Sequence, residues 1–336
     1  MNIFENRCAI HPRPQGDEVF WHSSIKRAAR GIRCRVLEHT IKNNGGYLSQ
    51  ACSSAEIFAS LYLKVMRLGS VPSPITPSSF PGVPGPHNSG YFTGADYNGP
   101  KDKDLDRFFL SPSQYSLVLY ATLIETGRMD PDGLEDFNKN GSVVEMIGAE
   151  HSPGMEVMSG SLGQGISQAA GIAMARKLHG ETGRIFIFMS DGEFQIGQVW
   201  EAIQTISFYK LLNIIIYVDI NGFQCDGKMT DVMNIEPLEK RLEAFGMRVY
   251  RIDGHNIEAL VSYGEIPSDG RATVILCDTC PWKDIPLLKS RYPKFHYLRF
   301  NTEEERERYR EFLSQTNGNT IKSSRKKPCR MGKKQA

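Results

Sequence analysis

The chain has 336 residues, of which 40% are hydrophobic and 23% are charged, as in ordinary globular proteins. This length can bury a sizeable core, so we expect one large domain over residues 1–300 and a charged helix with a basic, disordered tail over 301–336. The formal net charge is +2, but residues 322–334 carry seven cations and no acid, and subtracting them leaves −5 for residues 1–321. A mildly acidic body gives no reason to expect nucleic-acid binding.

Membrane and secretory signals are not found in the sequence. No apolar run approaches the ~20 residues of a membrane-spanning helix, and the first 14 residues lack the apolar centre of a secretory signal. The seven cysteines are scattered, and the Cys277–Cys280 pair has no second pair with which to bind zinc. We therefore expect a cytoplasmic protein with reduced thiols and no membrane partner.

Apolar periodicity predicts helices over residues 17–68, interrupted by a glycine-containing connection at 43–54, and again over 117–128. Residues 69–100 contain seven prolines and are predicted to form a long irregular excursion. The remaining predicted elements are a helix of small residues at 161–178, strands at 185–189, 214–218, 249–252 and 272–277, and a charged helix at 303–313.

The strongest functional signal lies between residues 184 and 227. A short apolar strand (185–189) leads to Ser190-Asp191-Gly192, a helix (about 194–210) follows, and a second strand (214–218) leads to Asp219-Ile220-Asn221-Gly222. Two apolar strands joined by a crossover helix are typical of buried parallel strands. We therefore predict an α/β fold with a doubly wound, mainly parallel sheet and helices on both faces. In such a sheet Asp191 and Asn221 follow the carboxyl ends of two strands, where ligands bind.

The chemistry of these residues indicates a metal and an anion. Carboxylate and amide oxygens are hard donors that suit Mg²⁺ or Ca²⁺. Gly192 allows the backbone to approach an anion, and the following helix directs its positive end toward it. A diphosphate with its divalent metal has both properties. The alternative is that the two segments are ordinary turns, since Asp, Asn and Gly favour turns.

This arrangement resembles the thiamine diphosphate motif, in which GDG is followed at a similar spacing by Asn; the spacing here is 30 residues. The flanking segments GQVWEA (197–202) and NGFQCDG (221–227) are similar to transketolases in particular, and the resemblance extends over roughly residues 25–299. It implies thiamine diphosphate and Mg²⁺ (or Ca²⁺) as cofactors. It also implies that Asp191, Asn221 and the backbone carbonyl of Phe223 bind the metal, while Gly192 contacts the diphosphate.

A second segment, GSLGQG (160–165), resembles the family segment that lies against the aminopyrimidine ring. By this resemblance Gly160 and Leu162 are expected to contact the cofactor. A dinucleotide-binding loop is the alternative, but the glycines do not follow the G-x-G-x-x-G spacing and no clear strand precedes them.

Several positions depart from the family pattern. Tyr47 and Gln114 stand where the family usually has histidines; Gln114 can still donate a hydrogen bond to the cofactor, but it cannot act as an acid or base. His151 is then the best candidate for a catalytic histidine, the alternative being a surface-loop histidine. His296 resembles a late Trp-His pair of the family and is the weaker candidate. Ile196 replaces a glutamate that links the two cofactor sites of the family dimer.

After Phe300 the sequence offers a helix and a basic tail, whereas the family continues into a domain that contacts the aminopyrimidine. We therefore expect a two-component transferase, in which a transketolase C-terminal-like, pyrimidine-binding subunit completes each site in a heterodimer of dimers. The expected reaction moves a two-carbon ketol or acyl unit from a small-molecule donor to an aldehyde or related carbonyl acceptor. The alternatives are the α subunit of a 2-oxo acid dehydrogenase and a non-catalytic protein that retains the fold.

Overall fold

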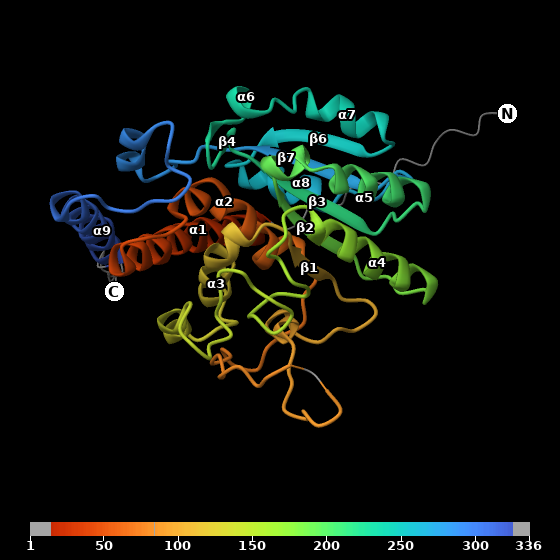
Figure 1. Ribbon diagram of the computed structural model, residues 1–336, viewed down its shortest axis with the longest axis horizontal. Helices are drawn as coiled ribbons and strands as arrows, with labels where there is room; N and C mark the ends of the chain where they lie inside the picture. Colours follow the sequence, from red (N-terminus) through yellow and green to blue (C-terminus); the bar gives the residue numbers. More distant parts are fainter. Residues whose placement is uncertain (1–14, 84, 325–336) are drawn as a thin grey trace, which may run out of the picture.

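The computed structural model describes residues 15–83 and 85–324. Its centre is a five-stranded sheet in which every neighbouring pair of strands is parallel (Figure 1). In spatial order the strands are β1 (Arg107–Leu110), β2 (Ile185–Ser190), β3 (Ile214–Ile220), β7 (Thr273–Asp278) and β6 (Arg248–Asp253). A two-stranded antiparallel ribbon, β4 (Phe223–Gln224) and β5 (Gly227–Lys228), follows β3. The predicted parallel α/β fold is confirmed.

Helices cover both faces of the sheet because successive side chains of each strand enter different cores. In β2, Phe186 and Phe188 belong to one core, whereas Ile185, Ile187 and Met189 belong to the other. The first core contains α1 (Gln15–Asn43), α2 (Leu48–Ser60), α3 (Ser116–Glu125) and α8 (Ile257–Gly264). The second contains α4 (Gln164–Leu178), α5 (Gly197–Phe208) and α7 (Leu238–Ala244). Figure 1 shows α1 to α3 on one side of the sheet and α4 and α5 on the other.

Three boundaries differ from the sequence-based expectation. The connection between the first two helices is shorter than the predicted 43–54, since α1 ends at Asn43 and α2 begins at Leu48. All residues of α2 are buried. This helix continues into a π-helical turn, Leu61–Val65. The helix α5 begins at Gly197 rather than near residue 194, because Asp191–Gln195 form a 3-10 turn and Ile196 is extended (φ −99°, ψ 127°). The short strand β1 was not predicted at all.

Residues 69–83 and 85–100 contain no α-helix or strand, only the 3-10 turn Gly94–Asn98 and isolated bridges such as Ile75 to Met129. This excursion extends below the sheet in the view of Figure 1. The remaining short elements are α6 (Met229–Val232) and 3-10 turns at Ser113–Tyr115, Pro131–Asp136 and Pro286–Arg291.

The last helix, α9 (Glu303–Ser324), is longer than the predicted 303–313 and packs on α1. Of the tail predicted to be disordered from residue 322 onward, residues 322–324 belong to α9, and residues 325–336 lie outside the described residues. Over the described ranges, every helix is too short or too polar to cross a membrane.

Candidate functional site

A cavity of about 240 Å³ lies at the carboxyl ends of β2 and β3. Six residues that the sequence assigned to cofactor or metal binding line it, and they come from separate segments of the chain. These six are Gln114, Leu162, Asp191, Gly192, Asn221 and Phe223. The other lining residues are Tyr115, Ser190, Gln195, Ile196, Gln224, Cys225, Asp226 and His296. The fold therefore gathers both halves of the Asp191–Asn221 motif around one space.

Asp191 joins the turns that follow β2 and β3. It is 3% exposed, its Oδ1 accepts a hydrogen bond from the Gly192 N–H (2.8 Å), and its Oδ2 accepts one from the Gly222 N–H (2.8 Å). Burial and the neighbouring charge of Asp219 raise the pKa of Asp191 to about 8. The carboxylate is thus fixed in position, and among the described residues no cationic side chain pairs with it.

Asn221 is oriented by a second buried carboxylate. Its Nδ2 donates to Oδ2 of Asp219 (3.2 Å) and to the Tyr115 hydroxyl (3.2 Å), while its Oδ1 accepts from the Phe223 N–H (2.9 Å). Asp219 also accepts hydrogen bonds from Ser53 (2.5 Å), Tyr115 (2.7 Å) and Thr279, and burial raises its pKa. Because the amide nitrogen is held by Asp219, the amide oxygen faces the opposite way.

These residues fit a divalent cation with a diphosphate. Asp191 and Asp219 are both buried, and over the described ranges no Lys, Arg or His forms an ion pair with either of them. Two uncompensated carboxylates at one site are costly unless a cation neutralises them. A Cβ added at Gly192 would meet nothing within 4 Å, which leaves room for anionic oxygens beside the backbone. One carboxylate, one amide and one backbone carbonyl form an all-oxygen donor set, which suits Mg²⁺ or Ca²⁺.

No group of three or more His, Cys, Asp or Glu side chains in the described part of the chain could hold a metal by itself. This agrees with a site that takes part of its ligands from an amide, a carbonyl and the bound anion, as Mg²⁺ sites at phosphates do.

The structure separates the two candidate histidines. His296 lines the cavity, and its ring meets that of Tyr47 edge-on (centroids 5.5 Å apart, 83°); burial lowers the pKa of His296. His151 does not line the cavity: its ring packs 4.7 Å from that of Phe80, and its Nε2 lies 3.6 Å from the Glu145 carboxylate. The catalytic role assigned to His151 therefore stays a prediction without support from this geometry.

Gly160 also lies outside the cavity lining. A Cβ there would come 2.5 Å from the Ile147 side chain, so the glycine makes room for that side chain. Its neighbour Leu162 does reach the cavity and is 36% exposed.

Other lining residues were not singled out by the sequence. Tyr115 follows Gln114 directly, and Cys225 and Asp226 form the turn of the β4–β5 ribbon. Their closeness in sequence to Gln114 and Phe223 was the available signal.

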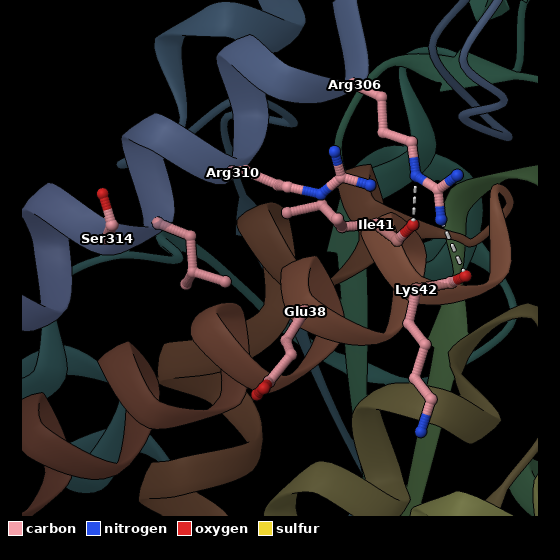
Figure 2. A pocket seen from close by; sticks show the side chains of 7 residues that line it. Glu38, Ile41, Lys42, Arg306, Arg310 and Ser314 are labelled. Atoms are coloured by element: carbon pink, nitrogen blue, oxygen red, sulfur yellow. Dashed lines mark hydrogen bonds between the residues drawn. The ribbon is translucent and has the colours of Figure 1, made fainter. Parts of the chain in front are cut away.

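A second cavity, of about 440 Å³, lies between α1 and α9 (Figure 2). Arg306 donates hydrogen bonds there to the carbonyl oxygens of Ile41 (2.7 Å) and Lys42 (2.9 Å) at the end of α1. Arg310 pairs with Glu303 and Glu307 of its own helix. The cations are occupied by helix-stabilising contacts, so this groove joins two helices and offers no comparable ligand chemistry.

The fold is an α/β fold, and the cavity at the carboxyl edge of its parallel sheet is lined by residues that would fit a divalent metal with a diphosphate. Residues 91–286 match the family model for the thiamine diphosphate binding domain of transketolase. The chain belongs to the transketolase family, and the resemblance predicted from its motifs is confirmed.

Three relatives illustrate this membership. The chain is 35% identical to the transketolase family protein y4mO of Sinorhizobium fredii, over 84% of this chain and 92% of that protein. It is 30% identical to the 6-deoxy-6-sulfo-D-fructose transketolase subunit SqwG of Clostridium sp., over 77% and 86% of the two chains. It is 28% identical to one of the subunits of the apulose-4-phosphate transketolase of Actinobacillus succinogenes, over 82% and 91%.

Solved structures agree at the level of the fold. A transketolase from Pichia stipitis superimposes with a TM-score of 0.64 at 20% identity, covering 89% of this chain. The match covers 45% of that transketolase, so this chain spans a little under half of its length.

Proposed function

We propose that this chain is the diphosphate-binding subunit of a two-component, thiamine diphosphate- and Mg²⁺-dependent transketolase-like enzyme. The observation that carries the proposal is the pair Asp191 and Asn221, which line one cavity and present oxygen atoms without a balancing cation. The names of two relatives support the division into subunits, because both are called subunits and both match this chain over most of their length.

The proposed roles are those that the family resemblance implies, and the lining of the cavity supports them. Asp191, Asn221 and the carbonyl of Phe223 would hold the metal, and the backbone at Gly192 would contact the diphosphate. Leu162 would lie against the ring system, as would Gly160 if that segment shifts on binding. When bound, thiamine diphosphate supplies the nucleophilic carbon and the electron sink needed to break a bond next to a carbonyl.

Two further side chains that line the cavity, Gln114 and His296, would act on a substrate or the cofactor by hydrogen bonding. Gln114 offers an amide that donates and accepts but does not titrate. His296 lines the cavity and would be the group that accepts a proton from a substrate hydroxyl; burial lowers its pKa, which favours the neutral imidazole. The catalytic role predicted for His151 stays a prediction; alanine substitution of His151 and of His296, with transfer activity as the readout, would decide between the two histidines.

The partner would bind the aminopyrimidine side of the cofactor, and two copies of each subunit would form a heterodimer of dimers. The reaction would transfer a two-carbon ketol or acyl unit to an aldehyde or related carbonyl acceptor. The α subunit of a 2-oxo acid dehydrogenase is less well supported, because the relatives reported above are transketolases or their subunits.

The test is reconstitution. The purified chain is mixed with a transketolase C-terminal-like subunit from the same source, thiamine diphosphate and Mg²⁺, and ketol transfer from hydroxypyruvate to an aldehyde is measured. We expect transfer only in the mixture and tighter cofactor binding than by the chain alone, because the partner adds ring contacts. An Asp191→Ala chain serves as the inactive control.

Robust turnover by this chain alone, free of any partner, would contradict the two-component proposal. Tight Mg²⁺-dependent cofactor binding without turnover in the mixture would favour the non-catalytic alternative.

A further inference from the structure

Glu193 is a buried carboxylate beside the cavity but not part of its lining. Its exposure is 0%, and in the described part of the chain no Lys, Arg or His forms an ion pair with it. Burying a carboxylate without a cation is costly unless its oxygens accept hydrogen bonds from fixed donors. The hydrogen-bond donors that contact Glu193 therefore show which segments of the chain this side chain connects.

Two distant segments and the end of β2 donate hydrogen bonds to this one carboxylate, the last within the capping box of Ser190 and Glu193. Its Oε1 accepts hydrogen bonds from the Ser111 hydroxyl and from the Gly163 N–H (2.9 Å), and its Oε2 accepts one from the Ser190 N–H (3.0 Å). Ser111 follows β1, Gly163 precedes α4, and Ser190 ends β2. Two of these contacts span 82 and 30 residues of sequence, so Glu193 connects parts of the chain that local structure does not.

Each donor lies within three residues of a side chain that lines the cavity. Ser111 leads to Gln114, Gly163 follows Leu162, and Ser190 precedes Asp191. The metal side, the ring side and the predicted hydrogen-bond donor of the site are thus fixed relative to one another through Glu193.

The packing around these donors leaves little freedom. Gly163 has a left-handed backbone (φ +79°), and a Cβ on it would come 3.2 Å from the side chain of Ile196. A Cβ on Gly165 would come 2.8 Å from the Cα of Ser111, so the start of α4 lies directly on the segment after β1. Small residues bring these segments together, and Glu193 supplies the polar contacts between them.

We propose that Glu193 is a positioning residue, which shapes the cofactor cavity by holding the segments after β1, after β2 and before α4 in one arrangement. The proposal rests on the proposed function, because the shape it sets is the shape that thiamine diphosphate and Mg²⁺ would meet. Glu193 touches neither; it acts through Ser111, Gly163 and Ser190.

The test compares two buried carboxylates at opposite ends of the sheet. Glu193→Gln keeps the size of the side chain but replaces one oxygen with an amide nitrogen, which opposes one or more of the three donors. The matched control is Asp106→Asn: Asp106 is also buried (3% exposed) and also accepts from two backbone N–H groups, those of Arg67 and Arg184, but it lies before β1. Calorimetric titration with thiamine diphosphate and Mg²⁺ gives the affinity, and thermal unfolding without cofactor gives the stability.

We expect Glu193→Gln to weaken cofactor affinity by about 10–100-fold, the usual loss when a residue supporting metal ligands is changed. The affinity is measured at a temperature where circular dichroism shows both variants fully folded. Asp106→Asn should lower the unfolding temperature and leave the affinity unchanged. In the reconstituted enzyme, Glu193→Gln should raise the KM for cofactor and leave kcat at saturating cofactor within about twofold, as expected for lost binding alone.

If Glu193→Gln does not fold, Ser111→Ala carries the test, since it removes one donor to Glu193 and leaves the carboxylate in place; a smaller loss of affinity in the same direction is expected. Wild-type affinity in the folded Glu193→Gln or Ser111→Ala chain would overturn the positioning role and leave the proposed function intact. A wild-type chain that does not bind the cofactor, even with the partner, would overturn both.

Discussion

The two ends of the central sheet treat buried carboxylates differently. At the amino ends of β1 and β2, Asp106 accepts hydrogen bonds from the backbone of Arg67 (2.7 Å) and Arg184 (2.8 Å) and pairs with the Arg184 guanidinium (2.7 Å). At the carboxyl ends of β2 and β3, Asp191 and Asp219 lie buried with hydrogen-bond donors but without a cation among the described residues.

The pKa values express the same difference. Burial works against ionisation of Asp106, but the hydrogen bonds and charge of Arg184 and the Arg67 backbone outweigh it and lower the pKa. Burial dominates for Asp191, Glu193 and Asp219 and raises the pKa of each. At the amino end the buried carboxylate is paired with an arginine. At the carboxyl end the buried carboxylates have no cationic partner among the described residues, and a divalent cation would supply the missing positive charge.

The largest expected effect is on cofactor binding, and it appears when one buried carboxylate at each end of the sheet is replaced by alanine. Asp191→Ala should abolish Mg²⁺-dependent binding of thiamine diphosphate, with a loss of at least ~10–100-fold, because a metal ligand is removed. Asp106→Ala should leave binding intact but lower the free energy of unfolding by about 3 kcal/mol, since two arginines lose their buried partner. Calorimetry and denaturant unfolding of both variants check this. Unchanged affinity in Asp191→Ala would show that the deficit of charge has another cause.

A buried carboxylate that is paired with cationic side chains should also make the free energy of unfolding depend on pH in acid. Glu56 is buried against Arg33 and His255; burial opposes its ionisation, but the hydrogen bond from His255 and the charge of Arg33 lower its pKa to about 2 from 4.5. Because the folded-state pKa is lowered, its stabilisation is complete above pH 4.5 and is lost as the pH falls toward 2, on the order of 3 kcal/mol in total. Glu56→Gln should flatten the pH dependence of unfolding in that window. An identical acid limb in the wild type and the variant would contradict this.

A smaller effect is expected away from both ends of the sheet. Arg306→Ala removes two hydrogen bonds to the last carbonyls of α1 and a cation from the negative end of that helix (Figure 2). The expected loss is about 1–2 kcal/mol of unfolding free energy with no change in cofactor affinity. Arg310→Ala, in the same groove, removes only exposed pairs within α9 and should change stability little. Equal effects of the two substitutions would argue against the role of Arg306 at the end of α1.

The smallest structural effect is expected for Ile196→Glu, which adds an acid to the end that already lacks cations. Ile196 is half-buried on the cavity wall and packs against the second core, so the variant should still fold, with a loss of about 1 kcal/mol of unfolding free energy. It should raise the activity of the reconstituted enzyme if the family's proton network persists in the partner. A crystal structure of the assembly that places Ile196 far from any subunit boundary would refute this.

Sequence patterns were sufficient for the central features of the fold and for most of the residues that line the cavity. The strands β2, β3, β6 and β7 were found within one or two residues at either end, because buried parallel strands are continuous apolar runs. Asp191 and Asn221 were found because both directly follow such strands. The four-residue strand β1 was missed, since it is too short to show a period and follows a run of charged residues.

Features that depend on long-range contacts were not predictable. His296 reaches the cavity only because the segment after β7 returns across α2 toward Tyr47, a contact between residues about 250 positions apart. The role of Glu193 depends on Ser111 and Gly163, whose positions become known only when the strands are paired. A sequence motif indicates candidate ligand-binding residues, but it does not indicate the distant residues that keep them in position.

The most direct test of the charge deficit is to locate a cation. Crystals of the chain grown with thiamine diphosphate and Mn²⁺, a substitute for Mg²⁺ that scatters anomalously, would show the metal as a peak in an anomalous difference map. We predict one strong peak within about 2.0–2.4 Å of oxygens from Asp191, Asn221 and the Phe223 carbonyl, the range of hard-cation coordination. A well-ordered metal elsewhere, or no peak at saturating cofactor and metal, would contradict the account.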